Sequence, residues 1–185
     1  MRTLSEIPLP EPPLADGEVL LRPFDRDDEA ALVEALRDPE IPRWTSIPSP
    51  YRDRDAREYV ARAERERRAG RELGLAIVER ARGALLGGIG LVMDAPQGRA
   101  EIGYWVAAGA RRRGVGSRAL RLLSRWALEA LAVGRVEVLA HPANEPSQRL
   151  AEAAGFTREG LLRSYRVRKG RREDLVMFSL LPEDP

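Results

Sequence analysis

Cysteine, histidine and lysine are nearly missing from this sequence of 185 residues, and the scarcity of the first two excludes several kinds of site. With no cysteine, the chain can form no disulfide, iron–sulfur cluster, thiolate zinc site or covalent cysteine intermediate. The only histidine, His141, cannot build a histidine-ligated metal centre alone, so a bound metal would need carboxylates. We therefore expect no metal site and no reaction that passes through a cysteine-bound group.

Long hydrophobic runs are missing as well. No apolar segment approaches the roughly 20 residues that a membrane-spanning helix needs. The first 13 residues contain four prolines, which is typical of neither a signal peptide nor a membrane anchor. These features predict a cytoplasmic protein with no membrane partner, and the lack of cysteine is compatible with that reducing compartment.

The composition is that of a folded globular protein, with 43% hydrophobic and 32% charged residues. At this length a single domain is expected, and its core would bury roughly 70% of the surface that the unfolded chain exposes. Proline-rich residues 1–16 predict an irregular N-terminal arm. Residues 17–185 then form the one predicted domain.

Charge is nearly balanced over the whole chain but unevenly placed. The net charge is +2, and Lys169 is the only lysine among 31 basic residues. Residues 1–40 carry eleven acids and four arginines, whereas residues 99–135 carry eight arginines and two acids. This local excess favours a small polyanion over nucleic acid, because an aromatic content of 5% offers few side chains for base stacking. A nucleic-acid-binding protein remains an alternative that salt-dependent binding would reveal.

Hydrophobic periodicity predicts a mixture of helices and strands. Four segments have helical spacing or helix-capping residues: 25–37, 53–69, the segment from 117 to about 134, and 147–154. Seven segments are predicted as strands: 19–22, 73–79, 85–92, 100–106, 135–140, 161–168 and 173–181. Prolines at 48 and 50 predict a loop over residues 44–51.

A glycine-rich turn, Arg111-Arg-Arg-Gly-Val-Gly116, joins the strand at 100–106 to the following helix. Glycines let a ligand approach the backbone closely, and the amides of a helix N-terminus attract anions such as phosphate. The turn is neither a Walker loop nor a dinucleotide fingerprint, because the required spacings are missing. The alternative is an ordinary tight turn with solvent-exposed arginines.

In context, Arg111, Gly114 and Gly116 resemble the Arg/Gln-x-x-Gly-x-Gly/Ala signature of the GCN5-related N-acetyltransferases (GNAT), in particular their RimJ/RimL branch. A second motif of that family is matched by Asn144, Ser147, Gly155 and Phe156. Shorter matches follow in the order of that branch: Leu21-Arg-Pro, Asp38-Pro, Glu101-Ile-Gly-Tyr-Trp105, and Gly170 with Asp174. The resemblance spans nearly the whole chain, from about Val19 to Leu181.

The resemblance implies an α/β (α+β) fold with a mixed, mainly antiparallel sheet of about seven strands and about four helices. The sheet would split between strands 100–106 and 135–140, and acetyl-CoA would enter the split. Its acetyl group and pantetheine arm would meet the main chain of Trp105 and Val106. The residues implied to hold its pyrophosphate are Arg111, Arg112, Arg113, Gly114, Val115, Gly116 and Ser117. Asn144 is either a turn residue or, like Ser147, a further cofactor contact.

Two residues are candidates for proton transfer in a direct attack of an amine on the thioester. Glu101 would act as the general base, through water, because an amine attacks only when neutral; the alternative is a carboxylate that balances nearby arginines or binds substrate. Many relatives place a tyrosine seven residues after the asparagine as general acid, but that position is Ala151 here. Ser147 is the substitute that the resemblance suggests, although a serine at a helix start is also a common N-terminal cap.

The acceptor is expected to be a primary amine, either a protein N-terminus or a small molecule. Candidates to line its site are Trp44, Tyr51, Tyr104, His141 and Tyr165, each of which could equally be a packing residue. A catalytically silent acyl-CoA-binding regulatory module is the alternative function. Many members of the family dimerise, but no segment identifies an interface, so the choice between monomer and homodimer stays open.

Overall fold

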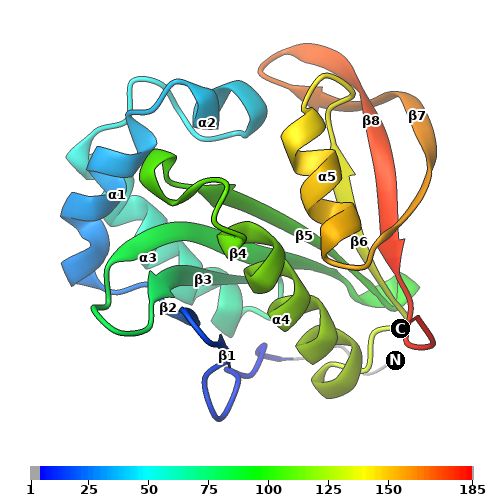
Figure 1. The fold of residues 1–185 in the computed structure, drawn as a ribbon, viewed down its shortest axis with the longest axis horizontal. Coiled ribbons are helices and arrows are strands. Elements are labelled where there is room, and N and C mark those ends of the chain that lie inside the picture. Colours follow the sequence, from blue (N-terminus) through cyan, green and yellow to red (C-terminus); the bar gives the residue numbers. More distant parts are fainter. Residues whose placement is uncertain (1–4, 185) are drawn as a thin grey trace.

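The computed structural model describes residues 5–184, which form one open sheet with helices on both faces (Figure 1). The strands are β1 (Ala15–Asp16), β2 (Val19–Pro23), β3 (Glu72–Glu79), β4 (Leu85–Asp94), β5 (Arg99–Val106), β6 (Arg135–Ala140), β7 (Thr157–Arg168) and β8 (Arg171–Leu180). The α-helices are α1 (Glu29–Leu36), α2 (Glu40–Trp44), α3 (Asp53–Arg68), α4 (Val115–Ala130) and α5 (Glu145–Ala153). The predicted fold class is confirmed, with eight strands where about seven were expected and five helices where about four were expected.

The sequence prediction missed the two-residue strand β1, which lies at the end of the arm predicted to be irregular, and the short helix α2. The third residue of α2 is Pro42, and a proline in the first turn removes an N–H group that has no intrahelical partner in any case. Asp38 supports this start, because its Oδ1 accepts the Glu40 N–H at 3.1 Å. The chain from α1 to Trp44 is therefore mostly helical, and the predicted loop begins only at Thr45.

The sheet runs in the order β1-β2-β3-β4-β5-β6-β8-β7, and every neighbouring pair is antiparallel except β5 and β6. In the part of the chain that the structure describes, the parallel pairing covers only Arg99–Glu101 of β5 against Arg135–Glu137 of β6. Beyond these positions the two strands diverge toward their C-terminal ends, as Figure 1 shows. The expected split between these two strands is confirmed.

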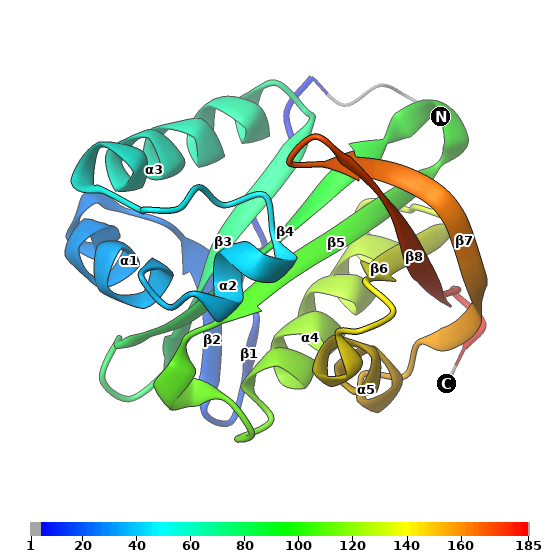
Figure 2. The ribbon, with the colours of Figure 1, turned by 90° about the horizontal axis from the view of Figure 1, so that it is seen from above.

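Alternating residues of the central strands contribute side chains to two separate hydrophobic cores, one on each face of the sheet. On one face, Ala100 and Ile102 pack beneath α4 and α5, whose buried residues include Leu120 and Ala151. On the other face, Trp105 belongs to a core formed with α1 and α3 (Figure 2). Because side chains alternate along a strand, Tyr104 and Val106 face α4 and α5, whereas Glu101 and Trp105 face the opposite side.

Residues 1–4 of the N-terminal arm lie outside the described residues, and the part from residue 5 onward is attached to the domain through its backbone. Ile7 is fully buried, its N–H donates to the Arg67 carbonyl at 3.0 Å, and its own carbonyl accepts from the Arg67 guanidinium at 2.9 Å. Arg67 also pairs with Glu6. None of the helices between residues 5 and 184 has the length and apolar character that crossing a membrane would require.

Candidate functional site

The split exposes one edge of β5. The Ala107 N–H donates to the Leu86 carbonyl at 2.9 Å, which continues the ladder between β4 and β5. Because hydrogen bonds alternate along antiparallel strands, the main-chain groups of Trp105 point to β4, and those of Tyr104 and Val106 point into the split. The Val106 carbonyl is occupied there by Arg111 Nε at 3.1 Å. The N–H groups of Tyr104 and Val106 are thus directed at any ligand that enters the split.

The glycine-rich turn begins α4 next to this edge. Gly114 is the N-cap residue with φ 75°, a left-handed conformation that glycine adopts without strain. Gly116 has a different reason to be glycine, since a Cβ atom there would lie 2.4 Å from Leu150 Cδ1 of α5 and 3.3 Å from Val106 Cγ2. The turn, the end of β5 and helix α5 therefore meet at Gly116.

The first turn of α4 offers backbone N–H groups to an anion. The N–H groups at the start of this 16-residue helix have no intrahelical acceptor, and Gly114 supplies no side-chain cap. They carry the partial positive charge of the helix N-terminus. The hydroxyl of Ser117 donates back to the Gly114 carbonyl at 3.1 Å. The residues present fit a phosphate-bearing ligand through main-chain donors more than through the serine side chain.

The three arginines of the turn differ in what they contact. Arg111 is half-buried and forms an ion pair with Asp38, the residue between α1 and α2, in addition to its bond with Val106. Arg112 and Arg113 are exposed, and Arg113 lies 3.8 Å from Glu79. Arg111 therefore links the turn to Asp38 and to the end of β5. Arg112 and Arg113 lie at the surface beside the helix N-terminus.

Across the split, helix α5 presents Asn144 and Ser147. Asn144 is the N-cap, and its Oδ1 accepts the Ser147 N–H at 3.3 Å. The alternative in which Ser147 caps this helix is therefore wrong, because the helix begins earlier than predicted and Asn144 has that role. The Ser147 hydroxyl instead lies 3.0 Å from the hydroxyl of Tyr104 on β5. Burial raises the pKa of Tyr104 to about 12, so its phenol is protonated at neutral pH.

Glu101 lies on the opposite face of the sheet and is held by an arginine of β7. Both of its carboxylate oxygens accept from the Arg166 guanidinium, at 2.8 and 2.5 Å. This hydrogen bond raises the pKa of Arg166. The two side chains are 31% and 43% exposed, and a pair so open to water contributes at most about 1 kcal/mol to stability. Each oxygen retains a second lone pair for a proton or a water molecule.

The aromatic candidates separate into surface and core residues. The rings of Trp44 and His141 lie 5.4 Å apart, which places the end of α2 beside the end of β6. Tyr165 is 45% exposed and lies in the irregular part of β7, between Leu162 and Arg166. Tyr51 is buried between α1 and α3, and its hydroxyl is the one buried side-chain polar atom without a hydrogen-bond partner among the described residues. Burial raises the pKa of Tyr51.

Sequence reasoning did not anticipate the contact between α2 and the tip of the β7–β8 hairpin. Arg168, held by Glu173 through two hydrogen bonds, donates to the Arg43 carbonyl at 2.8 Å. Lys169 Nζ donates to the Pro42 carbonyl at 2.5 Å. Figure 2 shows α2 and the hairpin tip side by side above the diverging strands. No local motif signals contacts between segments about 125 residues apart, so neither Arg166 nor Arg168 was identified from the sequence.

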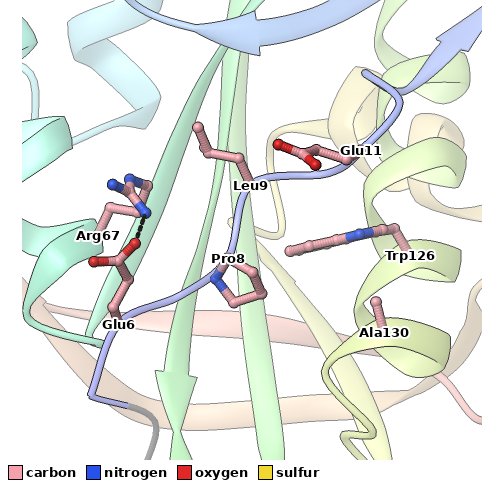
Figure 3. Close-up of a pocket in the computed structure, with 7 residues that line it drawn as sticks. All are labelled: Glu6, Pro8, Leu9, Glu11, Arg67, Trp126 and Ala130. Carbon is pink, nitrogen blue, oxygen red and sulfur yellow. Dashed lines mark hydrogen bonds and ion pairs between the residues drawn. The ribbon is translucent and has the colours of Figure 1, made fainter.

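A groove of about 540 Å³ lies elsewhere, between the N-terminal arm and the C-terminal half of α4 (Figure 3). Its lining residues are Glu6, Pro8, Leu9, Glu11, Arg67, Trp126 and Ala130. Trp126 comes ten residues after Gly116, which corresponds to about 15 Å along the helix. The groove is therefore separate from the split, where the polar groups converge.

Comparison with known proteins points to one family. The model of the acetyltransferase (GNAT) domain matches residues 18–157. The chain is 32% identical over 166 residues to Uncharacterized N-acetyltransferase p20 of Bacillus licheniformis, covering 89% of this chain and 93% of that protein. Its fold is similar to that of Mycobacterium smegmatis RimJ in complex with CoA-disulfide, with a TM-score of 0.79, 24% identity, and coverage of 89% and 82% of the two chains. The Microcin C7 self-immunity acetyltransferase MccE, in complex with acetyl-CoA and AMP, matches with a TM-score of 0.81 and 19% identity over 90% and 93% of the chains.

Proposed function

Because the chain belongs to the acetyltransferase (GNAT) domain family, we propose that it transfers the acetyl group of acetyl-CoA directly to a primary amine. The observation that carries this proposal is the split itself. The edge of β5 beyond Glu101 is unpaired by β6 in the described chain, and it leads directly into the glycine-rich N-terminus of α4. A thioester arm and a pyrophosphate require these two features side by side.

Residues on the α4 and α5 face would hold the donor. First-turn N–H groups of α4, with Arg112 and Arg113 nearby, suit the pyrophosphate. The Val106 N–H points into the split, where it can donate to the acetyl carbonyl oxygen as negative charge develops on it. The same α/β arrangement occurs in MccE, whose structure contains acetyl-CoA, and in RimJ, whose structure contains a CoA disulfide.

Residues on the opposite face would prepare the acceptor. An α-amino group has a reference pKa of about 7.7 to 8.0 and a lysine amine about 10.4, so an acceptor is largely protonated at neutral pH. We assign Glu101 as the group that receives the amine proton, through water, by way of the lone pairs that Arg166 leaves open. Because the ion pair with Arg166 contributes little to stability, its main effect would be to keep the carboxylate charged and oriented.

Ser147 would serve the leaving sulfur. It lies at the start of α5, across the split from Val106, and its hydroxyl is not used to cap the helix. A thiol has a reference pKa of about 8.5, so the departing sulfur gains from a hydrogen bond or a proton. The acceptor itself would lie between the wall of Trp44 and His141 and the β7–β8 hairpin, and both classes, a peptide N-terminus and a small amine, remain in the proposal.

Release of free thiol from acetyl-CoA, measured across a panel of small amines and peptide N-termini, tests the proposal. We expect at least one amine to accelerate thiol release and to gain 42 Da by mass spectrometry. A protein that binds acetyl-CoA but releases no thiol with any amine would instead be the silent acyl-CoA-binding module.

A further inference from the structure

The hydroxyl of Tyr104 joins the two sides of the split. It lies 3.0 Å from Ser147 Oγ and 3.2 Å from the Ser147 carbonyl oxygen. Tyr104 belongs to β5 and Ser147 to α5, and the two are 43 residues apart in the sequence. The ring of Tyr104 packs against the core beneath α4, so the position of its hydroxyl is fixed by packing.

The direction of the hydrogen bond between the two hydroxyls decides whether the serine proton is free for a ligand. Each hydroxyl has one proton to donate, whereas the Ser147 carbonyl can only accept. If the phenol donates to the carbonyl, the serine proton is spent on the phenol oxygen. If the phenol donates to Ser147 Oγ, the serine proton is free to bond a third atom. Burial raises the pKa of Tyr104 to about 12, so the phenol has its proton to donate at neutral pH.

The remaining polar groups of Ser147 are already committed. Its N–H donates to Asn144, at 3.3 Å to Oδ1 and 3.1 Å to the carbonyl. This leaves the hydroxyl as the one group of Ser147 that can turn toward a ligand. A hydroxyl that accepts a hydrogen bond is polarised and becomes a better donor itself.

We infer that Tyr104 is a positioning residue for acetyl transfer, whose hydroxyl bonds Ser147 Oγ, fixes the serine side chain and directs the serine proton toward the departing sulfur. The inference rests on the proposed function. In one turnover the nitrogen–carbon bond forms and the carbon–sulfur bond breaks. Counted from the neutral amine, the nitrogen gives up one proton on the Glu101 side, and the sulfur receives one from Ser147. Ser147 regains a proton through Tyr104, Tyr104 regains one from water, and Glu101 releases its proton to water. The net change is one proton moved from the neutral amine to the thiol; an amine that starts as the ammonium form first releases one further proton to water.

Tyr104→Phe tests the inference, because it removes the hydroxyl and keeps the packed ring. We expect kcat to fall about 10- to 100-fold, with KM for acetyl-CoA and the melting temperature nearly unchanged. In a Ser147→Ala background the same change should cost nothing further, because the two hydroxyls act as one unit. Tyr59→Phe is the matched control, since Tyr59 is a half-buried phenol on the other face whose hydroxyl contacts Trp105 Nε1 at 3.5 Å.

Three outcomes would count against the account, and they are distinguishable. Wild-type kcat in Tyr104→Phe, with an impaired Ser147→Ala, would overturn the role of Tyr104 alone. Full activity in Ser147→Ala would remove the serine from the proposed mechanism and Tyr104 with it. If no amine is acetylated and the protein also shows no slow hydrolysis of acetyl-CoA, both the proposed function and the inference fail.

Discussion

The proposed donor side and the proposed acceptor side of the split are built in different ways. On the donor side, one continuous stretch from Tyr104 to Ser117 supplies the strand edge, the turn and the helix N-terminus, and the groups proposed to bind the donor are mostly main-chain N–H groups. On the acceptor side, side chains from distant segments meet, as in Glu101 with Arg166 and Arg168 with the Arg43 carbonyl. A local motif can therefore identify the donor site, whereas the acceptor site depends on the folded chain.

Glu101→Gln should give the largest effect on the acceptor side. Glutamine keeps one oxygen for Arg166 but cannot accept a proton, so turnover at neutral pH should fall by roughly 10² to 10⁴. Steady-state rates of thiol release, with binding of acetyl-CoA measured separately, check this. Glu129→Gln, which changes an exposed carboxylate near the end of α4, controls for the loss of one charge. Unchanged turnover in Glu101→Gln would mean that the site acts by positioning alone.

On the donor side, the two glycines of the turn should respond differently to alanine. Gly116→Ala would overlap Leu150 and should destabilise the fold by about 1 to 3 kcal/mol. Gly114→Ala meets no atom closer than 3.8 Å and should cost only the strain of a positive φ, about 1 to 2 kcal/mol. Denaturant unfolding measures both values.

Replacing Leu150 by alanine separates these two explanations. Leu150→Ala should rescue Gly116→Ala and leave the cost of Gly114→Ala unchanged, because only Gly116 contacts that side chain. If Gly114→Ala and Gly116→Ala lowered the free energy of unfolding equally, and Leu150→Ala altered neither loss, the two glycines would not differ as the structure indicates.

Arg168→Ala tests the contact between α2 and the hairpin. Without this arginine, α2 loses a hydrogen-bonded partner, and the wall that contains Trp44 becomes less fixed. We expect KM for the amine to rise several-fold, on the order of 1 kcal/mol for one lost hydrogen bond, while KM for acetyl-CoA stays the same. Arg171→Ala, an exposed arginine of the same hairpin, is the control. A rise in KM for both the amine and acetyl-CoA would show that the donor and acceptor sides are not independent.

Glu159→Gln should give a small effect that is present near neutral pH and is lost in acid. Hydrogen bonds from Arg135 and Ser179 lower the pKa of Glu159 from 4.5 to about 2. A depressed pKa stabilises the folded state above pH 4.5, and that contribution is lost as the pH falls toward 2. Glu159→Gln should therefore lower stability slightly at pH 6 and have a much smaller effect near pH 2. The side chain is 40% exposed, so the difference should be a few tenths of a kcal/mol, measured by denaturant unfolding at both pH values.

The contrast between local segments and contacts of distant segments also explains which features could be predicted from the sequence. The turn and the helix after it follow from local patterns, the split was expected from the family resemblance, and β6 was predicted with its observed bounds, Arg135–Ala140. Helix α2 was missed because proline usually ends a helix, although Pro42 lies in a first turn where proline is tolerated. Ser147 was considered as a cap because the start of α5 was placed two residues late. The partners of Arg111 and Glu101 could not be predicted, because Asp38 and Arg166 lie far away in sequence and nothing local selects them.

The melting temperature with and without acetyl-CoA tests the central claim, that the N-terminus of α4 holds the donor. At a concentration near 100 times Kd, the wild-type protein should gain roughly 5 to 10 °C. Gly114→Glu should abolish the gain, because its carboxylate would stand where the pyrophosphate binds. Gly170→Glu, at another exposed glycine of positive φ, should retain it. An equal gain in Gly114→Glu would contradict the assignment.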